Sequence, residues 1–223
     1  MTGFAESVRV ASLAVAALAP IVNPLGSAPV FLAMSADLPT AARRQLPRRV
    51  AWNSFLLLAA AMLTGSHLLR FFGISVPIVR VGGGLLVMAN GWRLLHADDP
   101  PATTRVAPTD AWQREVARRA FYPLTFPLTV GPGSLSIAIT IGAGISRQSI
   151  AGVVDVLSDL VGVAIVALSV SLSYRFAGRV VALVGETGVT VFLRLTSFIL
   201  LCVGVSIMWG GLTDLIRPLI LRG

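Results

Sequence analysis

Residues 20–30 have the sequence PIVNPLGSAPV, in which Asn23-Pro24-Leu25-Gly26 interrupts an apolar stretch that runs from Ser7 to Met34. A second apolar stretch, Phe121 to Ile145, is interrupted in the same way by Gly131-Pro132-Gly133. Proline and glycine normally end a helix or mark a loop. Unpaired backbone groups cost several kcal/mol each in a hydrocarbon layer, so such breaks must line a cavity or be covered by protein. We therefore expect two membrane spans that are broken near mid-membrane.

The composition of the whole chain favours a membrane protein. Its 223 residues are 55% apolar and 13% charged, with a mean hydropathy of +0.83, whereas soluble domains carry about 25% charged residues. Neither a soluble globule nor a disordered chain is expected. The single cysteine, Cys202, excludes a disulfide framework within the chain. No cleavable signal peptide is expected, because Glu6 and Arg9 precede the first apolar run and no small-residue cleavage site follows it.

Six apolar stretches are long enough to cross a bilayer, at about 20 residues per helical crossing. They are residues 7–34, 50–72, 76–95, 121–145, 150–174 and 189–215. The predicted fold class is therefore an all-α integral membrane protein with six transmembrane helices, the first and fourth of them broken. Residues 1–223 are expected to form a single transmembrane domain.

The arginines between the spans predict the orientation. All 18 basic residues are arginine, and eleven of them lie in or beside the segments that follow spans one, three and five, against five on the other side. The positive-inside rule makes the richer side cytoplasmic, which places both termini on the non-cytoplasmic side. Orientation in the membrane explains the formal charge of +8, so no nucleic-acid partner is expected.

The two halves of the chain resemble each other. The polar stretch 97–119 is the expected cytoplasmic linker between a first three-helix repeat, 1–96, and a second, 120–223. Arg80 follows Pro24 by 56 residues, and Arg194 follows Pro132 by 62. A repeat of three crossings places its second copy upside down, as in secondary transporters whose paired broken helices form the binding site. The sequence therefore predicts two inverted-topology repeats.

The two breaks carry the candidate substrate site. Freed N–H groups at a helix start can face an anionic group, and freed carbonyls can face a cation. An amino acid zwitterion has both charges, and glycines leave room for the backbone to approach a small ligand. The predicted substrate-binding residues are Asn23, Pro24, Gly26, Ser27, Thr129, Gly131, Pro132, Gly133 and Ser134.

Asp155 and Asp159 stand one helical turn apart in the fifth span. At ~1.5 Å per residue, Asp159 would lie about 13 Å into the membrane. An ionised carboxylate is costly at that depth, which makes Asp159 a candidate proton carrier. The structural alternative is a span that begins later, with Asp159 paired with Arg80 or Arg194.

Four further polar residues are expected to have coupling or structural roles. For Arg80 and Arg194, snorkelling to the interface, a salt bridge or the capping of a broken helix compete with substrate contact. Asn53 and Asn90 are expected to make interhelical hydrogen bonds. No enzyme activity, cofactor or metal site is expected, because the histidines have no Cys, Asp or Glu partner at a metal-ligand spacing.

Three stretches of the chain carry a family resemblance. They are IVNPLGSAPVF at 21–31, FFGIS at 71–75 with Arg80 and Gly82-Gly83-Gly84, and PLTFPLTVGPGS at 123–134. Together they resemble the MarC family of bacterial and archaeal inner-membrane proteins, also called the six-span neutral amino acid transporter family. The resemblance covers essentially the whole chain. It implies a bacterial inner membrane location, two inverted repeats and, as in some members, transport of glycine or alanine. By position it implies site residues at both breaks, with Arg80 and Arg194 as motif arginines, whereas Asp155 and Asp159 match no family motif.

These observations predict a secondary transporter of small neutral amino acids that works by alternating access in the lipid bilayer. Protons and sodium are the candidate coupling ions. A homo-oligomer is compatible with the sequence. An exporter of drugs or other metabolites is one alternative. The other is a non-transporting membrane scaffold, in which the breaks serve helix packing alone.

Overall fold

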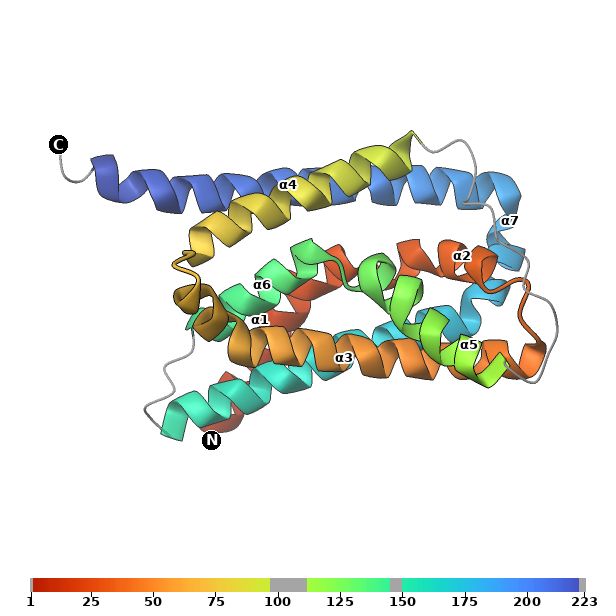
Figure 1. Ribbon diagram of the computed structural model, residues 1–223, viewed down its shortest axis with the longest axis horizontal. Coiled ribbons are helices and arrows are strands. Elements are labelled where there is room, and N and C mark those ends of the chain that lie inside the picture. The colour runs from red at the N-terminus through yellow and green to blue at the C-terminus, as the bar shows by residue number, and fades with distance from the viewer. Residues whose placement is uncertain (1, 97–111, 145–149, 221–223) are drawn as a thin grey trace.

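The computed structural model describes residues 2–96, 112–144 and 150–220 (Figure 1). Every regular element within these ranges is helical, which confirms the all-α prediction. The elements are α1 Thr2–Val22, α2 Pro24–Met34, α3 Thr40–Phe71, α4 Val76–Leu95, α5 Trp112–Arg119, the π-helical segment η1 Ala120–Thr129, α6 Pro132–Gly144 and α7 Ile150–Ile220.

Four helical stretches in the described residues are long and apolar enough to cross a membrane. They are Phe4–Leu32, Thr40–Phe71, Gly152–Arg179 and Leu193–Arg217. A fifth is added if Glu115–Thr129 and Pro132–Gly144, which are bent by 75° at the second break, count as one span. Helix α4 has the bounds predicted for the third span but is not among these candidates, because Arg80, Asn90 and Arg93 lower its hydropathy.

Helix α3 begins at Thr40, whereas the apolar pattern predicts a start at Val50. The added turns are amphipathic. Ala42 and Leu46 are fully buried one helical turn apart. Three arginines of the same segment are exposed, namely Arg44, Arg48 and Arg49. A search for continuous apolar residues misses such a segment, because only one face of the helix is hydrophobic.

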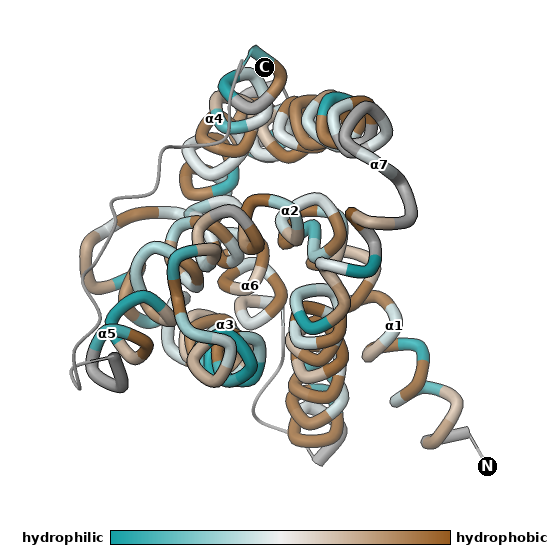
Figure 2. The backbone as a smooth tube through the Cα atoms, turned by 90° about the vertical axis from the view of Figure 1, so that its right-hand side faces the viewer, coloured by the Kyte–Doolittle hydropathy of each residue, from teal (hydrophilic) through white to brown (hydrophobic). Residues whose placement is uncertain are grey.

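Successive segments run in alternating directions along the longest axis of the molecule (Figure 1). The first turn of α1, the connection between α3 and α4, and the last turn of α7 lie at one end. The start of α3, helix α5 and the bend in α7 lie at the other end. Figure 2 shows that hydrophilic residues gather on α5 and on nearby turns of α3. The arginine-rich segments therefore share one end of the molecule, and the side of the membrane that this end faces stays a prediction.

Helix α7 consists of two helices joined at Gly185, whose φ of +73° is a conformation that glycine adopts at little cost. The predicted fifth and sixth spans lie on either side of this residue and overlap the candidates Gly152–Arg179 and Leu193–Arg217. We refer to them as the first and second parts of α7.

Glycines bring α4 and the second part of α7 into close contact. A Cβ atom at Gly84 would lie 2.7 Å from the Gly204 carbonyl oxygen, and one at Gly204 would lie 2.8 Å from the Gly84 carbonyl oxygen. Gly91 and Gly211 make equally close approaches further along the same two helices. Small residues let helix backbones approach each other in membranes. The two helices consequently lie side by side along one edge of the molecule (Figures 1 and 2).

The expected linker 97–119 ends in an ordered helix. Residues 97–111 lie outside the described residues, and the remainder forms α5. Val116 is fully buried, and the Arg119 guanidinium donates to Asp37 Oδ1 and Glu115 Oε1, both at 2.8 Å. The contact with Asp37 ties the start of the second broken segment to the loop that follows α2.

Candidate functional site

The first break is a single residue, Asn23, between α1 and α2. Its φ of +46° lies in the left-handed region, which asparagine tolerates better than most residues. Asn23 Oδ1 accepts a hydrogen bond from the Gly26 N–H at 3.1 Å and so caps the first turn of α2. A Cβ atom at Gly26 would collide with the Asn23 amide. The helix continues across this break, since the Asn23 N–H still donates to the Ala19 carbonyl.

The second break is longer and sharper. Segment η1 ends at Thr129, and the chain turns by 75° before α6 begins at Pro132. Within η1, Tyr122 and Phe126 have extended backbone angles, because each precedes a proline, which disfavours helical conformation. The Ser134 hydroxyl donates to the Gly131 carbonyl at 2.9 Å. Both predicted breaks are thus present, but they differ in geometry.

Gly133 brings α6 close to α4. A Cβ atom at Gly133 would collide with the Val87 side chain, and one at Gly83 would lie 2.7 Å from Ser136 Cβ. A large side chain at position 133 would therefore separate these two helices, whether or not the break binds a ligand.

Tyr174, near the end of the first membrane-spanning part of α7, joins the two breaks. Its hydroxyl lies 2.7 Å from the Thr129 hydroxyl at the end of η1, and Ser27 of α2 is a second polar neighbour. Its ring stacks on Phe31 of α2, with ring centroids 4.3 Å apart. All four side chains are buried. We call Ser27, Phe31, Thr129 and Tyr174 the tyrosine cluster.

The hydrogen bonds of the tyrosine cluster have a definite direction. The Thr129 hydroxyl donates to the Leu124 carbonyl at 2.6 Å, and the Ser27 hydroxyl donates to the Asn23 carbonyl at 2.9 Å. Because a hydroxyl has a single proton to donate, the bond between Tyr174 and Thr129 must be donated by Tyr174. The hydroxyls of both breaks are therefore satisfied by neighbouring groups of the chain in this conformation.

A cavity of about 740 Å³ adjoins the tyrosine cluster, and Phe31 and Tyr174 form part of its wall. Arg43, Arg175 and Arg179 also line it. Arg43 donates to the Ser35 and Ala36 carbonyls and so satisfies the end of α2. A cavity lined by one sign of charge concentrates ions of the opposite sign, so this cavity favours solutes with a carboxylate or another anionic group.

Asp155 and Asp159 lie away from the breaks. Asp159 is 6% exposed, and Gly162, on the same face of α7, packs against Ala11 and Ala14 of α1. Ala14 precedes Asn23 by nine residues, or roughly 13 Å along a helix at ~1.5 Å per residue. Asp155 lies close enough to Arg9 for their charges to interact. The acids thus face the N-terminal half of α1.

Arg80 and Arg194 occupy different environments. Arg80 Nη1 donates to Asp214 Oδ2 at 2.6 Å and links α4 to the second part of α7. Arg194 is exposed. The ion pair of Asp159 with Arg80 or Arg194, which is the structural alternative to proton transport, is not found. Asn53 lines a groove on α3, and Asn90 is half-buried on α4.

Sequence reasoning missed two of these residues. Asp214 is an acid inside the sixth predicted span, and the cost of a charge there could have marked it as an acid that needs a partner. Tyr174 stands at the end of an apolar span, where tyrosine is common at membrane interfaces. Nothing local distinguishes it from an interfacial tyrosine, so its contact with both breaks had no signal in the sequence.

Comparison with known proteins agrees with the sequence resemblance. Residues 8–216 match the profile of a family described as MarC family integral membrane protein. The chain is 29% identical over 209 residues to the proteins named UPF0056 inner membrane protein MarC in Escherichia coli O1:K1 / APEC and in Escherichia coli strain K12. These alignments cover 92% of this chain and 95% of each relative. No solved structure matches the chain. Because the family profile spans nearly all of its residues, the chain belongs to the MarC family of integral membrane proteins.

Proposed function

We propose that this protein is a secondary transporter of small neutral amino acids, of the glycine and alanine type, which works by alternating access in the inner membrane. Membership of the MarC family and the names of its relatives support a membrane protein of transporter type. The observation that carries the proposal is the tyrosine cluster, which brings the two broken spans together through Thr129 and Tyr174.

The two breaks that the tyrosine cluster joins offer an amino acid zwitterion two kinds of partner. The start of α6, at Gly133 and Ser134, offers backbone N–H groups and the positive end of a helix dipole to the carboxylate. Carbonyl oxygens at the first break, including that of Asn23, accept from the ammonium group. Because the Ser27, Thr129 and Tyr174 hydroxyls are bonded to the chain in the present conformation, binding exchanges the Tyr174–Thr129 bond for bonds to the ligand. That exchange connects the site to the arginine-lined cavity beside Tyr174.

The six-span inverted repeat and the position of both termini outside the cytoplasm are part of the proposal. The alternating direction of the segments and the packing of α4 on the second part of α7 support the repeat. Gly204 stands 120 positions after Gly84, and Gly211 stands 120 positions after Gly91. Their contacts follow the same spacing, since Gly84 meets Met208 and Gly204 meets Met88. With an offset of 120 positions between the two repeats, Arg80 corresponds to Leu200 and not to Arg194.

A non-transporting scaffold is the second candidate function. The packing of Gly133 on Val87 favours it, because a glycine needed for helix packing explains part of the second break without a ligand. A scaffold would not be stabilised by any small solute, whereas a transporter is stabilised by its substrate through mass action.

The test combines binding and transport by the purified protein. A thermal-shift screen against the twenty amino acids should show stabilisation by glycine or alanine, and proteoliposomes should take up the same labelled solute. Asn23→Ala should abolish uptake while the protein is still expressed and folded. It removes the cap on Gly26, at about 1 kcal/mol of folding stability. Thr64→Ala, at an exposed position of α3 outside both breaks, is the control and should keep uptake.

A second variant separates the backbone of the first break from its side chain. Asn23→Gly preserves the freedom to adopt a positive φ but loses the cap. If the wild type neither binds nor transports any amino acid, transport of this substrate class is rejected. If it transports and both Asn23 variants keep full uptake, the site is elsewhere.

A further inference from the structure

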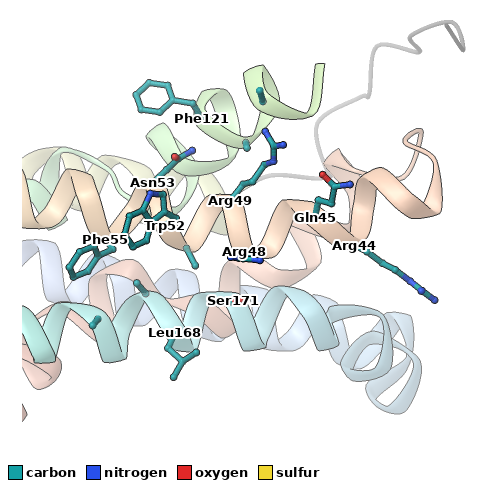
Figure 3. Close-up of a pocket in the computed structure, with 15 residues that line it drawn as sticks. Arg44, Gln45, Arg48, Arg49, Trp52, Asn53, Phe55, Phe121, Leu168 and Ser171 are labelled. Carbon is teal, nitrogen blue, oxygen red and sulfur yellow. The ribbon is translucent and has the colours of Figure 1, made fainter. Parts of the chain in front are cut away.

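A groove of about 1130 Å³ opens on α3, between α5 with the start of η1 on one side and the first part of α7 on the other (Figure 3). Exposed arginines of α3 line one end of it, namely Arg44, Arg48 and Arg49. The groove is separate from the tyrosine cluster, although Arg44 and Arg48 also line the cavity beside Tyr174. Arg49 lines the groove and not that cavity.

The arginines of the groove have no acidic partner within the part of the chain that the structure describes. Arg119, nearby on α5, is different because it binds both Asp37 and Glu115. A guanidinium without a counter-charge is suited to bind phosphate through paired hydrogen bonds. The arginine end of the groove therefore favours an anionic group such as a phosphate.

Away from the arginines the groove is lined mostly by apolar side chains, with Asn53 beside Trp52 as a polar exception (Figure 3). Trp52, one helical turn after Arg48, is 60% exposed, and tryptophan prefers the level of the lipid carbonyls. Leu168 of α7 and Phe121 of η1 are 57% and 48% exposed. In Figure 3 Ser171 lies toward Arg48, while Leu168 lies toward Trp52. Polarity thus falls along α3 from Arg48 through Trp52 to Phe55. It falls in the same direction along α7, from Ser171 to Leu168.

We propose that this groove binds an anionic phospholipid. The phosphate lies against Arg48 and Arg49, the glycerol region lies beside Trp52, and an acyl chain lies along Leu168 and Phe121. A free phosphate ion would use the arginine end alone and would leave the exposed apolar side chains without a partner. Basic pockets between spanning helices recognise lipid headgroups in this way. The lipid site rests on other observations than the proposed transport activity, although Arg48 also lines the cavity beside Tyr174.

The test measures lipid binding by the full chain in detergent, through thermal unfolding. Phosphatidylglycerol added to the micelles should raise the unfolding temperature, whereas phosphatidylcholine and inorganic phosphate should not. The double variant Arg48→Gln/Arg49→Gln should weaken phosphatidylglycerol binding on the order of 30-fold, since each arginine near a lipid surface contributes about fivefold. Arg93→Gln/Arg118→Gln removes the same charge from exposed arginines outside the groove and should leave the affinity unchanged.

Trp52→Ala tests the apolar half of the site and should weaken binding without any change in charge. Equal stabilisation by phosphatidylcholine would overturn the proposal, because the headgroup charge would then not matter. Stabilisation by inorganic phosphate alone would identify a simple anion site instead. Equal losses in the two double variants would show a general effect of net charge. Retained binding by both Arg48→Gln/Arg49→Gln and Trp52→Ala would place the lipid elsewhere.

Discussion

The Tyr174 hydroxyl donates a hydrogen bond to the Thr129 hydroxyl, 2.7 Å away, across 45 positions of sequence. This bond connects the end of η1, at the second break, to a tyrosine whose ring stacks on α2, just after the first break. Two interruptions that are separate in the sequence thereby become parts of one buried cluster. A ligand that enters this cluster must compete with the bond between the two hydroxyls.

Tyr174→Phe removes this hydroxyl and keeps the ring that stacks on Phe31. The variant should fold, with a loss of about 1 kcal/mol of unfolding free energy for one buried hydrogen bond. Uptake of glycine or alanine should change at least severalfold, because the exchange of this bond accompanies binding. Tyr122→Phe, at a tyrosine that is 65% exposed, is the matched control. Uptake that is the same in both variants would exclude the Tyr174 hydroxyl from the transport cycle.

Gly84→Ala should disrupt the pairing of α4 with the second part of α7. The new Cβ atom would lie 2.5 Å from the Met208 backbone nitrogen, and backbone atoms cannot move aside as a flexible side chain can. Overpacking of this kind costs typically 1–3 kcal/mol, measured as a lower temperature of thermal unfolding. Gly82→Ala, on the same helix with nothing within 4 Å, should have little effect. Equal stability of the two variants would argue against the close packing.

Stability should fall in acid because of Asp37. The hydrogen bond and charge of the Arg119 guanidinium hold the pKa of Asp37 below its usual value. A carboxyl whose pKa is lowered by folding stabilises the protein above its unfolded pKa of about 3.9 and loses that contribution as pH falls toward the folded value. Thermal unfolding followed from about pH 7 down to pH 3 should show this loss.

Asp37→Asn should flatten that acid-dependent loss and lower stability at neutral pH by about 1–3 kcal/mol, because Arg119 loses a charged partner. Glu6→Gln breaks the exposed pair with Arg9 and should change stability little. An Asp37→Asn protein with an unchanged acid response would assign that response to other carboxyls.

Asp159→Asn tests proton coupling. If Asp159 carries the proton, the variant should lose the response of uptake to an imposed proton gradient and should change its pH profile. Ser158→Ala, at the adjacent buried position, serves as the control for local packing. A normal pH profile and a normal response to the gradient in Asp159→Asn would show that Asp159 is not the carrier, which leaves sodium as the other candidate ion.

The sequence by itself predicted the helical fold, the two breaks and most helix positions, because apolar runs, prolines and glycines act locally. It misplaced the start of α3, where a partly buried helix is mostly polar. It also gave no indication that the breaks differ in sharpness. The sharp turn lies between Thr129 and Pro132, where Val130 has an extended backbone, whereas Asn23 alone lets the helix continue.

Contacts between distant residues were decided by the tertiary structure. Arg80 and Asp214 are 134 positions apart, and no local pattern selects one acid as the partner of that arginine. The same holds for Tyr174, whose role depends on which helix faces the breaks. Local sequence determines where a chain is helical and where it is interrupted, whereas side-chain partners depend on how the helices pack, which is a property of the whole chain.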